Sequence, residues 1–298
     1  MIFYQTGYTN NVDVDKRSPN DLDVISKLSV LAQGFATSVF EVIGIKLDYS
    51  IQQIAEMFCA FKCNSFSICD EEMNSVGTGL YLDCSVMNHS CEPNCAVVFK
   101  DAKLYVKCIN ERVSKGVELT ISYIDLAQST PSRQLRLEEQ YCFKCACKRC
   151  ELHTGDDQLL QGNELTTSLP HFKDIKKSKQ QHLDVLETLY QDNVSKLGEM
   201  NENLILLSNL LCSEYINVQQ FQKSLLHASR VLKAFEMCYP ALHPMLGIQF
   251  ALVSKLQNYL GHSAEANHNL QKAVHILNIT HSHSTHPFVQ DITNSHTK

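Results

Sequence analysis

Residues 88–94 have the sequence Asn-His-Ser-Cys-Glu-Pro-Asn, and two further motifs follow them along the chain. Residues 118–123 are Glu-Leu-Thr-Ile-Ser-Tyr, and residues 145–150 are Cys-Ala-Cys-Lys-Arg-Cys. Each motif alone is a weak signal, because short strings of this kind recur by chance. All three motifs in this order are unlikely to occur together by chance, and they decide the fold class of the chain.

The cysteines indicate a metal site. There are 13 of them, and Cys142, Cys145, Cys147 and Cys150 fall within nine residues. An odd and uneven set, without a secretory signal after Met1, favours a reducing compartment and metal binding over a disulfide framework. Cys145, Cys147 and Cys150 supply three thiolates, and tetrahedral zinc needs a fourth ligand. Cys142 is one candidate, since its Cys-x-x-Cys spacing with Cys145 also suits zinc.

Length and charge limit the classes of function. A chain of 298 residues favours two domains with a buried core. Its 26 Lys and Arg against 32 Asp and Glu give a net charge of -6, which argues against direct nucleic-acid binding and suits a basic peptide better. Residues 28–45 form a long apolar stretch, but they include Gln33, Thr37, Ser38 and Glu41, so we expect no membrane span there.

Periodicity predicts the elements around the motifs. Residues 51–62 show one apolar helix face after a capping-type start near Ser50. A second helix is expected after Ser129 or Thr130, with Pro131 in its first turn, and it leads into the cysteine cluster. We expect β-rich pieces at residues 65–68, 96–99, 103–108 and 118–122, with a turn at residues 77–79.

The pattern beyond about residue 156 is helical. Residues 225–244 and 270–287 are amphipathic runs that each close on a His-Pro pair. Their similarity suggests helix-hairpin repeats, although the spacing exceeds that of a tetratricopeptide repeat (TPR) and only two copies are visible. A generic helical bundle is the alternative.

The three motifs, together with Cys-Asn-Ser-Phe at residues 63–66 and Gly-Thr-Gly-Leu-Tyr at residues 77–81, resemble those of SET-domain protein lysine methyltransferases. With its helical C-terminal region, the chain is similar to the SMYD (SET and MYND domain-containing) family over about residues 48–298. The resemblance implies an α+β fold in three parts. These are a poorly defined leader and helix at residues 1–47, a partial SET-domain β-sheet with its post-SET zinc region at residues 48–155, and an all-α, TPR-like helical-repeat domain at residues 156–298.

The resemblance also implies an activity, the transfer of a methyl group from S-adenosylmethionine to lysines of histones or other proteins. Tyr123 is the expected catalytic residue, because its phenol would orient the methyl group and the incoming nitrogen. Asn88 would bind the cofactor through its side-chain amide and His89 through its backbone. Phe143 is expected to stack against the adenine.

Two further groups of residues take roles from the resemblance. Phe66 and Tyr141 are expected to line the lysine channel, where aromatic faces favour an alkylammonium group by about 0.5 to 2 kcal/mol. Cys91 is expected to be the fourth ligand of a structural zinc ion. The complete expected ligand set is Cys91, Cys145, Cys147 and Cys150.

Two parts of the family are not found ahead of residue 48. The chain has no cysteine before Cys59, so we find no MYND zinc finger, and we find no glycine-rich opening segment of the SET domain. We therefore expect the chain alone to be weak or inactive, since in-line displacement depends on how firmly donor and acceptor are held. The alternative is a catalytically silent scaffold that binds partner peptides through its helical domain. The resemblance also implies a heat-shock chaperone C-terminal tail as a partner, and a cytoplasmic and nuclear location.

Overall fold

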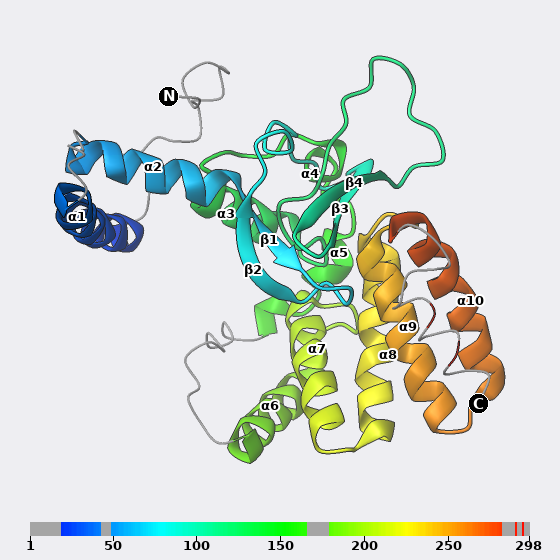
Figure 1. Ribbon diagram of the computed structural model, residues 1–298. Helices are drawn as coiled ribbons and strands as arrows, with labels where there is room; N and C mark the ends of the chain where they lie inside the picture. The colour runs from blue at the N-terminus through cyan, green and yellow to red at the C-terminus, as the bar shows by residue number, and fades with distance from the viewer. Residues whose placement is uncertain (1–18, 43–48, 166–178, 282–289, 291–293, 295–298) are drawn as a thin grey trace. The chain divides into compact units, whose positions relative to one another are not determined.

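The computed structural model describes residues 19–42, 49–165, 179–281, 290 and 294 (Figure 1). The chain divides into two compact units that alternate along the sequence. The first unit contains Met1–Ile68, Ser75–Asn88 and Gln134–Cys145, and the second contains Cys69–Asn74, His89–Arg133 and Ala146–Lys298. The domain boundaries at residues 47 and 155 that the sequence suggests stay predictions.

Two helices that pack against each other begin the first unit, α1 (Pro19–Val42) and α2 (Ile51–Asn64). The predicted helix at residues 51–62 is confirmed, and its start is a capping box. The Gln53 backbone N–H donates to Ser50 Oγ at 3.2 Å, and the Ser50 N–H donates to Gln53 Oε1 at 2.8 Å. Such reciprocal bonds satisfy N–H groups that have no partner within the helix. An ion pair of 2.6 Å between Lys62 and Asp21 joins α2 to α1.

The next two strands are β1 (Ser65–Cys69) and β2 (Ser75–Leu80), which pair in a two-stranded sheet. The turn predicted at residues 77–79 is wrong, because these residues lie inside β2. Glycine has a packing role here. A Cβ atom on Gly79 would lie 2.9 Å from the ring of Tyr81 and 3.2 Å from the Ile68 side chain.

The second unit contains an antiparallel pair, β3 (Cys95–Lys100) and β4 (Lys103–Cys108), as the sequence predicted. The strand predicted at residues 118–122 is wrong, because only Ile121 forms an isolated parallel bridge, with His89. Hydrogen bonds from a side chain take the place of some strand-to-strand backbone hydrogen bonds in this segment. Asn94 donates to the Glu118 carbonyl at 2.7 Å and accepts from the Thr120 N–H at 2.9 Å, so these backbone groups are satisfied without a neighbouring strand.

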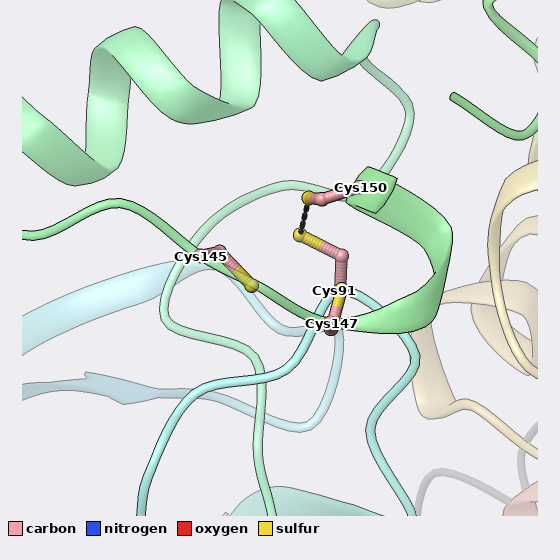
Figure 2. A group of neighbouring side chains, drawn as sticks. All are labelled: Cys91, Cys145, Cys147 and Cys150. Carbon is pink, nitrogen blue, oxygen red and sulfur yellow. Dashed lines mark hydrogen bonds between the residues drawn. The ribbon is translucent and has the colours of Figure 1, made fainter. Parts of the chain in front are cut away.

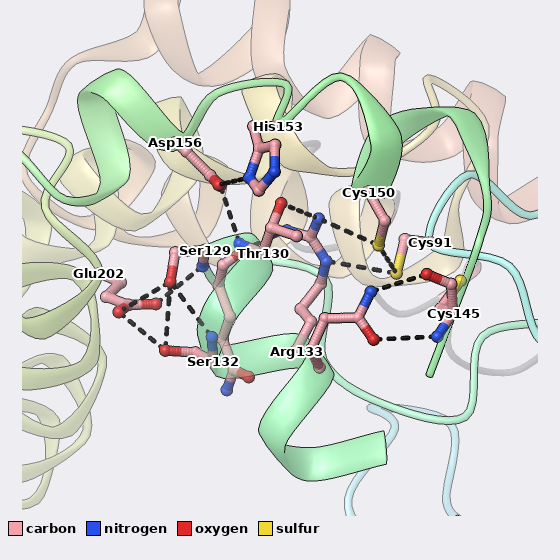
Figure 3. Close-up of polar contacts among 12 residues, drawn as sticks. Cys91, Ser129, Thr130, Ser132, Arg133, Cys145, Cys150, His153, Asp156 and Glu202 are labelled. Carbon is pink, nitrogen blue, oxygen red and sulfur yellow. Dashed lines mark hydrogen bonds and ion pairs between the residues drawn. The ribbon is translucent and has the colours of Figure 1, made fainter. Parts of the chain in front are cut away.

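Helix α3 (Thr130–Tyr141) starts as the sequence predicted, with Pro131 in its first turn. Ser129 is the capping residue, since its Oγ accepts from the Ser132 N–H at 3.4 Å. Glu202 accepts from the Ser129 N–H at 2.7 Å, and Asp156 accepts from the Thr130 N–H at 2.8 Å (Figure 3). Carboxylates are favourable at this end because the helix dipole is positive there.

The helical prediction beyond residue 156 is confirmed. The elements after α3 are α4 (Lys148–Glu151), α5 (Asp156–Leu159), the 3-10 helix η3 (Asn163–Leu165), α6 (Lys179–Val194), α7 (Glu202–Asn217), α8 (Phe221–Cys238), α9 (Pro244–Tyr259) and α10 (Ser263–Thr280). From α6 to α10, each helix packs against the next (Figure 1). This sequential packing is typical of helix-hairpin arrays. Among the described residues, no helix is both long and apolar enough to cross a membrane.

One of the two His-Pro pairs opens a helix. Pro244 is in the first turn of α9, and the Met245 N–H donates to Nδ1 of His243 at 3.3 Å, so His243 is the helix cap. The second pair, at residues 286–287, lies outside the described residues.

Candidate metal centre and active site

Four cysteine side chains come together in space in the folded chain (Figure 2). The sulfur atoms of Cys91, Cys145, Cys147 and Cys150 all lie within 4.8 Å of one another, and Cys91 Sγ is 3.5 Å from Cys150 Sγ. These are the four expected ligands. Among the described residues, the group does not include Cys142, the rival candidate.

The four sulfurs fit a tetrahedral zinc ion. Zinc–sulfur distances of about 2.3 Å place tetrahedral thiolates roughly 3.8 Å apart, so small side-chain rotations close the observed group around the metal. Local structure prepares the arrangement. Cys147 precedes the single turn α4, and the Cys150 N–H donates to the Cys147 carbonyl at 2.9 Å. Gln134 holds Cys145 from both sides, accepting from its N–H at 2.9 Å and donating to its carbonyl at 2.7 Å.

A buried arginine borders the cluster. Arg133 is 0% exposed, and its Nε donates to Cys91 Sγ at 3.2 Å (Figure 3). Its other nitrogens donate to the Gln128 carbonyl, to Thr130 Oγ1 at 2.9 Å and, at a long 3.8 Å, to Cys150 Sγ. Burial opposes the charge of the guanidinium, but the two sulfurs outweigh it and raise the pKa of Arg133 above its ordinary value.

Sequence reasoning gave Arg133 no role in the site. Its position offers one signal, because it follows the Ser129 cap by four residues and therefore lies on the first turn of a helix that leads into the cysteine cluster. Four thiolates around one zinc ion carry a net charge of minus two, and a buried cation offsets part of it.

His89 connects the cluster to Tyr123 within the second unit. The Tyr123 backbone N–H donates to His89 Nδ1 at 3.0 Å, so this nitrogen carries no proton. In the neutral ring the proton is then on Nε2, which lies 3.3 Å from Cys91 Sγ and donates to it. Burial lowers the pKa of His89 to about 4, against the charge of Cys147, which raises it, so the imidazole is neutral at pH 7.

The side chain of His89 was also missed by sequence reasoning, which assigned a role only to its backbone. The rings of His89 and Tyr123 lie 5.3 Å apart between centroids. The Ser90 N–H donates to the Ile121 carbonyl at 3.0 Å, which holds the same two segments together beside this contact. Tyr123 is therefore held by its backbone, and its phenol is half-buried.

The other predicted site residues lie in the first unit. Asn88 is exposed and is the residue directly before His89, whereas Phe66, Tyr141 and Phe143 are half-buried. Phe66 meets Tyr81 edge to face at 6.0 Å between ring centroids. Burial, followed by the charge of Cys63, raises the pKa of Tyr141. The convergence of these residues with Tyr123 on one pocket stays a prediction.

The segment after Tyr123 is also fixed to helix α8. Arg149 is buried and donates to the Cys238 carbonyl at 2.9 Å and to the Leu126 carbonyl at 3.0 Å. Tyr239 donates to Asp125 Oδ1 at 2.7 Å. Both contacts join residues 125–126 to the end of α8. Within the second unit, the segment from Tyr123 to Leu126 is therefore fixed to α8 as well as, through His89, to Cys91.

Comparisons with known proteins agree with this geometry. Residues 8–124 match the SET domain family, and the match begins inside the segment expected to be a leader. The histone-lysine N-methyltransferase SMYD3 of Mus musculus is 33% identical over 244 residues, which cover 80% of this chain and 56% of SMYD3. The histone-lysine N-methyltransferase ASHR1 of Arabidopsis thaliana is 31% identical over 288 residues, which cover 81% of this chain and 60% of ASHR1. The N-lysine methyltransferase SMYD2 of Homo sapiens is 25% identical over 254 residues, which cover 79% of this chain and 58% of SMYD2.

The chain thus spans a little over half the length of the relatives that it matches. The SET match, the helical array and the four-cysteine cluster all agree with the resemblance carried by residues 88–94, 118–123 and 145–150. The chain belongs to the SMYD family of SET-domain protein lysine methyltransferases.

Proposed function

We propose that this chain carries the catalytic and C-terminal part of an S-adenosylmethionine-dependent protein lysine methyltransferase. The observation that supports it most directly is the connection through His89. One ring nitrogen of His89 accepts from the Tyr123 backbone, and the other donates to Cys91, a proposed zinc ligand. The tyrosine expected to act in methyl transfer is thereby held against the segment expected to bind the cofactor.

The residues of the chain position the reactants. S-adenosylmethionine supplies an electrophilic methyl group when bound, and a neutral lysine amine is the acceptor. Asn88 fits a role in binding, because it is exposed while the next residue, His89, is held by two hydrogen bonds. Phe143 would stack on the adenine, and Phe66 and Tyr141 would line the lysine channel. Orientation of this kind is worth several kcal/mol in transfer reactions.

We also propose that the cysteine cluster holds a structural zinc ion. Four thiolates leave no open coordination position, so the metal does not act on substrate. Its role is mechanical, because it joins the segment at Cys91 to the loop at Cys147 and Cys150. Arg133 lowers the cost of gathering four thiolates in a buried place.

The substrate is proposed to be a lysine in a histone tail or another protein. The relatives named above are histone-lysine and N-lysine methyltransferases. The net charge of -6 favours the approach of a basic peptide. We further propose a cytoplasmic and nuclear location for the protein.

The cofactor proposal is tested by calorimetric titration of the zinc-loaded chain with S-adenosylmethionine. Micromolar binding that is lost in Asn88→Ala and kept in Asn74→Ala, a matched exposed asparagine, supports it. No detectable heat with the wild type contradicts cofactor binding by this chain. Methylation assays then compare the chain alone with a fusion to the N-terminal part of a relative.

A second candidate is a scaffold in which helices α6 to α10 bind partner peptides, such as the C-terminal tail of a heat-shock chaperone. Among the described residues, Arg230 Nε on α8 is buried without a hydrogen-bond partner, although Nη1 donates to Tyr190. The Arg230 residue as a whole is half-buried, so an acidic group on a partner would approach its positive charge from solvent and not through the buried Nε. Titration with an acidic C-terminal peptide should give binding that weakens in Arg230→Met and not in Lys272→Met; equal binding by both variants contradicts the placement.

A further inference from the structure

A second pair of thiols lies apart from the metal cluster, at the open end of the β3–β4 hairpin. Cys95 is directly opposite Cys108 in the antiparallel register, whereas Lys100 and Lys103 are opposite each other at the turn. The Ile109 N–H donates to the Asn94 carbonyl at 2.9 Å, just outside the cysteine pair. A bond in this place makes Cys95 and Cys108 a non-hydrogen-bonded pair, the kind in which opposite side chains are closest.

The spacing of such a pair suits a disulfide. Opposite Cα atoms in a non-hydrogen-bonded pair are about 4.5 Å apart, and disulfides join Cα atoms from about 4.4 to 6.8 Å apart. Both cysteines are free thiols, and they occupy directly opposite positions in the antiparallel pair. The Cys108 thiol also donates to the Asn110 carbonyl at 3.3 Å, which keeps its sulfur at this end of the hairpin.

The two thiols differ in their access to solvent. Cys108 is exposed, while Cys95 is 1% exposed. Burial, followed by the neighbouring Cys108 sulfur, raises the pKa of the Cys95 thiol. An oxidant from solvent therefore meets Cys108 first, and Cys95 is placed to react with the oxidised sulfur.

We propose that Cys95 and Cys108 form a reversible oxidation site that hydrogen peroxide converts to an intrachain disulfide. In the first step the Cys108 thiolate attacks one peroxide oxygen, the O–O bond breaks, hydroxide leaves, and Cys108 becomes a sulfenic acid. In the second step Cys95 loses its proton and attacks the Cys108 sulfur, the S–O bond breaks, and water leaves. Two thiols are oxidised by two electrons, and one peroxide is reduced to two waters.

The position of the pair gives this oxidation a local consequence. Asn94, the residue before Cys95, holds the segment before Tyr123 through Glu118 and Thr120, and the Cys95 N–H donates to the Thr120 carbonyl at 3.0 Å. A disulfide between Cys95 and Cys108 thus closes the hairpin at the end where it meets residues 118–120. The cysteines of the metal cluster are a separate group, and thiolates bound to zinc are less available to peroxide.

The test is peptide mapping of the zinc-loaded, full-length chain after mild peroxide treatment without reductant. Trypsin releases residues 108–112 as one peptide and residues 63–100 as another, and fragmentation before Pro93 separates Cys95 from the other cysteines of the longer peptide. We expect these two peptides to be linked through Cys95 and Cys108, and to separate on adding dithiothreitol. The link should be lost in Cys108→Ala, a change at an exposed position, and kept in the matched control Cys84→Ser.

Two results would overturn the proposal. One is Cys108 advancing to sulfinic acid with no linked peptide, which shows that Cys95 does not reach it. The other concerns the Cys95→Ala variant. If Cys108 forms disulfides with other cysteines there in the same yield as it does with Cys95 in the wild type, the hairpin does not determine the pairing. Neither result bears on the proposed methyl transfer, whose test uses cofactor binding.

Discussion

Replacing Arg133 by methionine tests whether the buried guanidinium supports the metal centre. Methionine fills a similar volume but donates no hydrogen bond. The change leaves Cys91 Sγ without its donor at 3.2 Å, Thr130 Oγ1 without its donor at 2.9 Å, and the Gln128 carbonyl without its bond. Because Arg133 is 0% exposed, water does not replace these donors in the folded state.

The magnitude follows from the type of bonds that are lost. Hydrogen bonds to charged groups contribute about 1.5 to 3 kcal/mol each, and removing one partner of a buried ionic contact costs about 3 to 5 kcal/mol. The bond to Cys150 Sγ at 3.8 Å is long and adds little. We therefore expect Arg133→Met to lower the free energy of unfolding by about 3 kcal/mol, or roughly 100-fold in the equilibrium constant. Arg133→Lys keeps the charge but loses the fork of donors, so its loss should be smaller.

The assay is urea unfolding of the zinc-loaded chain, followed by circular dichroism and by zinc release to a chromogenic chelator. Arg136→Met is the matched control, since Arg136 is on the same helix α3 and is exposed. It should change stability by less than about 0.5 kcal/mol. If Arg133→Met and Arg136→Met release zinc at the same urea concentration, Arg133 does not support the metal centre.

Three further predictions follow from the site and from the helical array. Cys147→Ser should lose about one zinc per chain, whereas Cys142→Ser should keep it; metal analysis that shows equal zinc in both removes the proposed ligand set. Tyr123→Phe should abolish lysine methylation by the fusion protein while circular dichroism stays unchanged, and a fully active variant would mean that the site is misassigned. Burial lowers the pKa of His243 to about 3, so its contribution to stability is complete above about pH 6.5 and is lost as the pH falls towards 3. Between pH 7 and 5 the loss should be about 2 kcal/mol in urea unfolding, and His243→Asn, which keeps a capping acceptor, should remove that part of the pH dependence.

Local rules predicted much of the fold. The helix after Ser50 and the helix with Pro131 in its first turn were expected, because a cap and a proline act within one turn. Most of the cysteine cluster could also be predicted, since three of its members lie within six residues of sequence. Cys91 came from family resemblance, and no rule of spacing connects it to a residue 59 positions away.

The errors came from side-chain contacts that the sequence pattern does not reveal. Residues 118–122 have a strand-like composition, but the Asn94 side chain bonds to the Glu118 carbonyl and the Thr120 N–H, and nothing within that segment signals such a partner. Gly79 was taken for a turn residue, although its lack of a side chain serves the packing of Tyr81 and Ile68. A glycine needed for space and a glycine needed for backbone freedom look the same in a sequence.

The side chain of His89 connects Cys91, one of the four clustered cysteines, to Tyr123. Its proton is on Nε2 because Nδ1 accepts from the Tyr123 N–H, so the direction of one hydrogen bond determines the other. If Cys91 moves when zinc leaves, the imidazole loses the sulfur that it donates to, and its contact with the Tyr123 backbone loosens with it. A zinc ion bound by the four cysteines would therefore act on the position of Tyr123 without contacting it. A change at the cysteines should consequently alter methyl transfer even when the cofactor still binds.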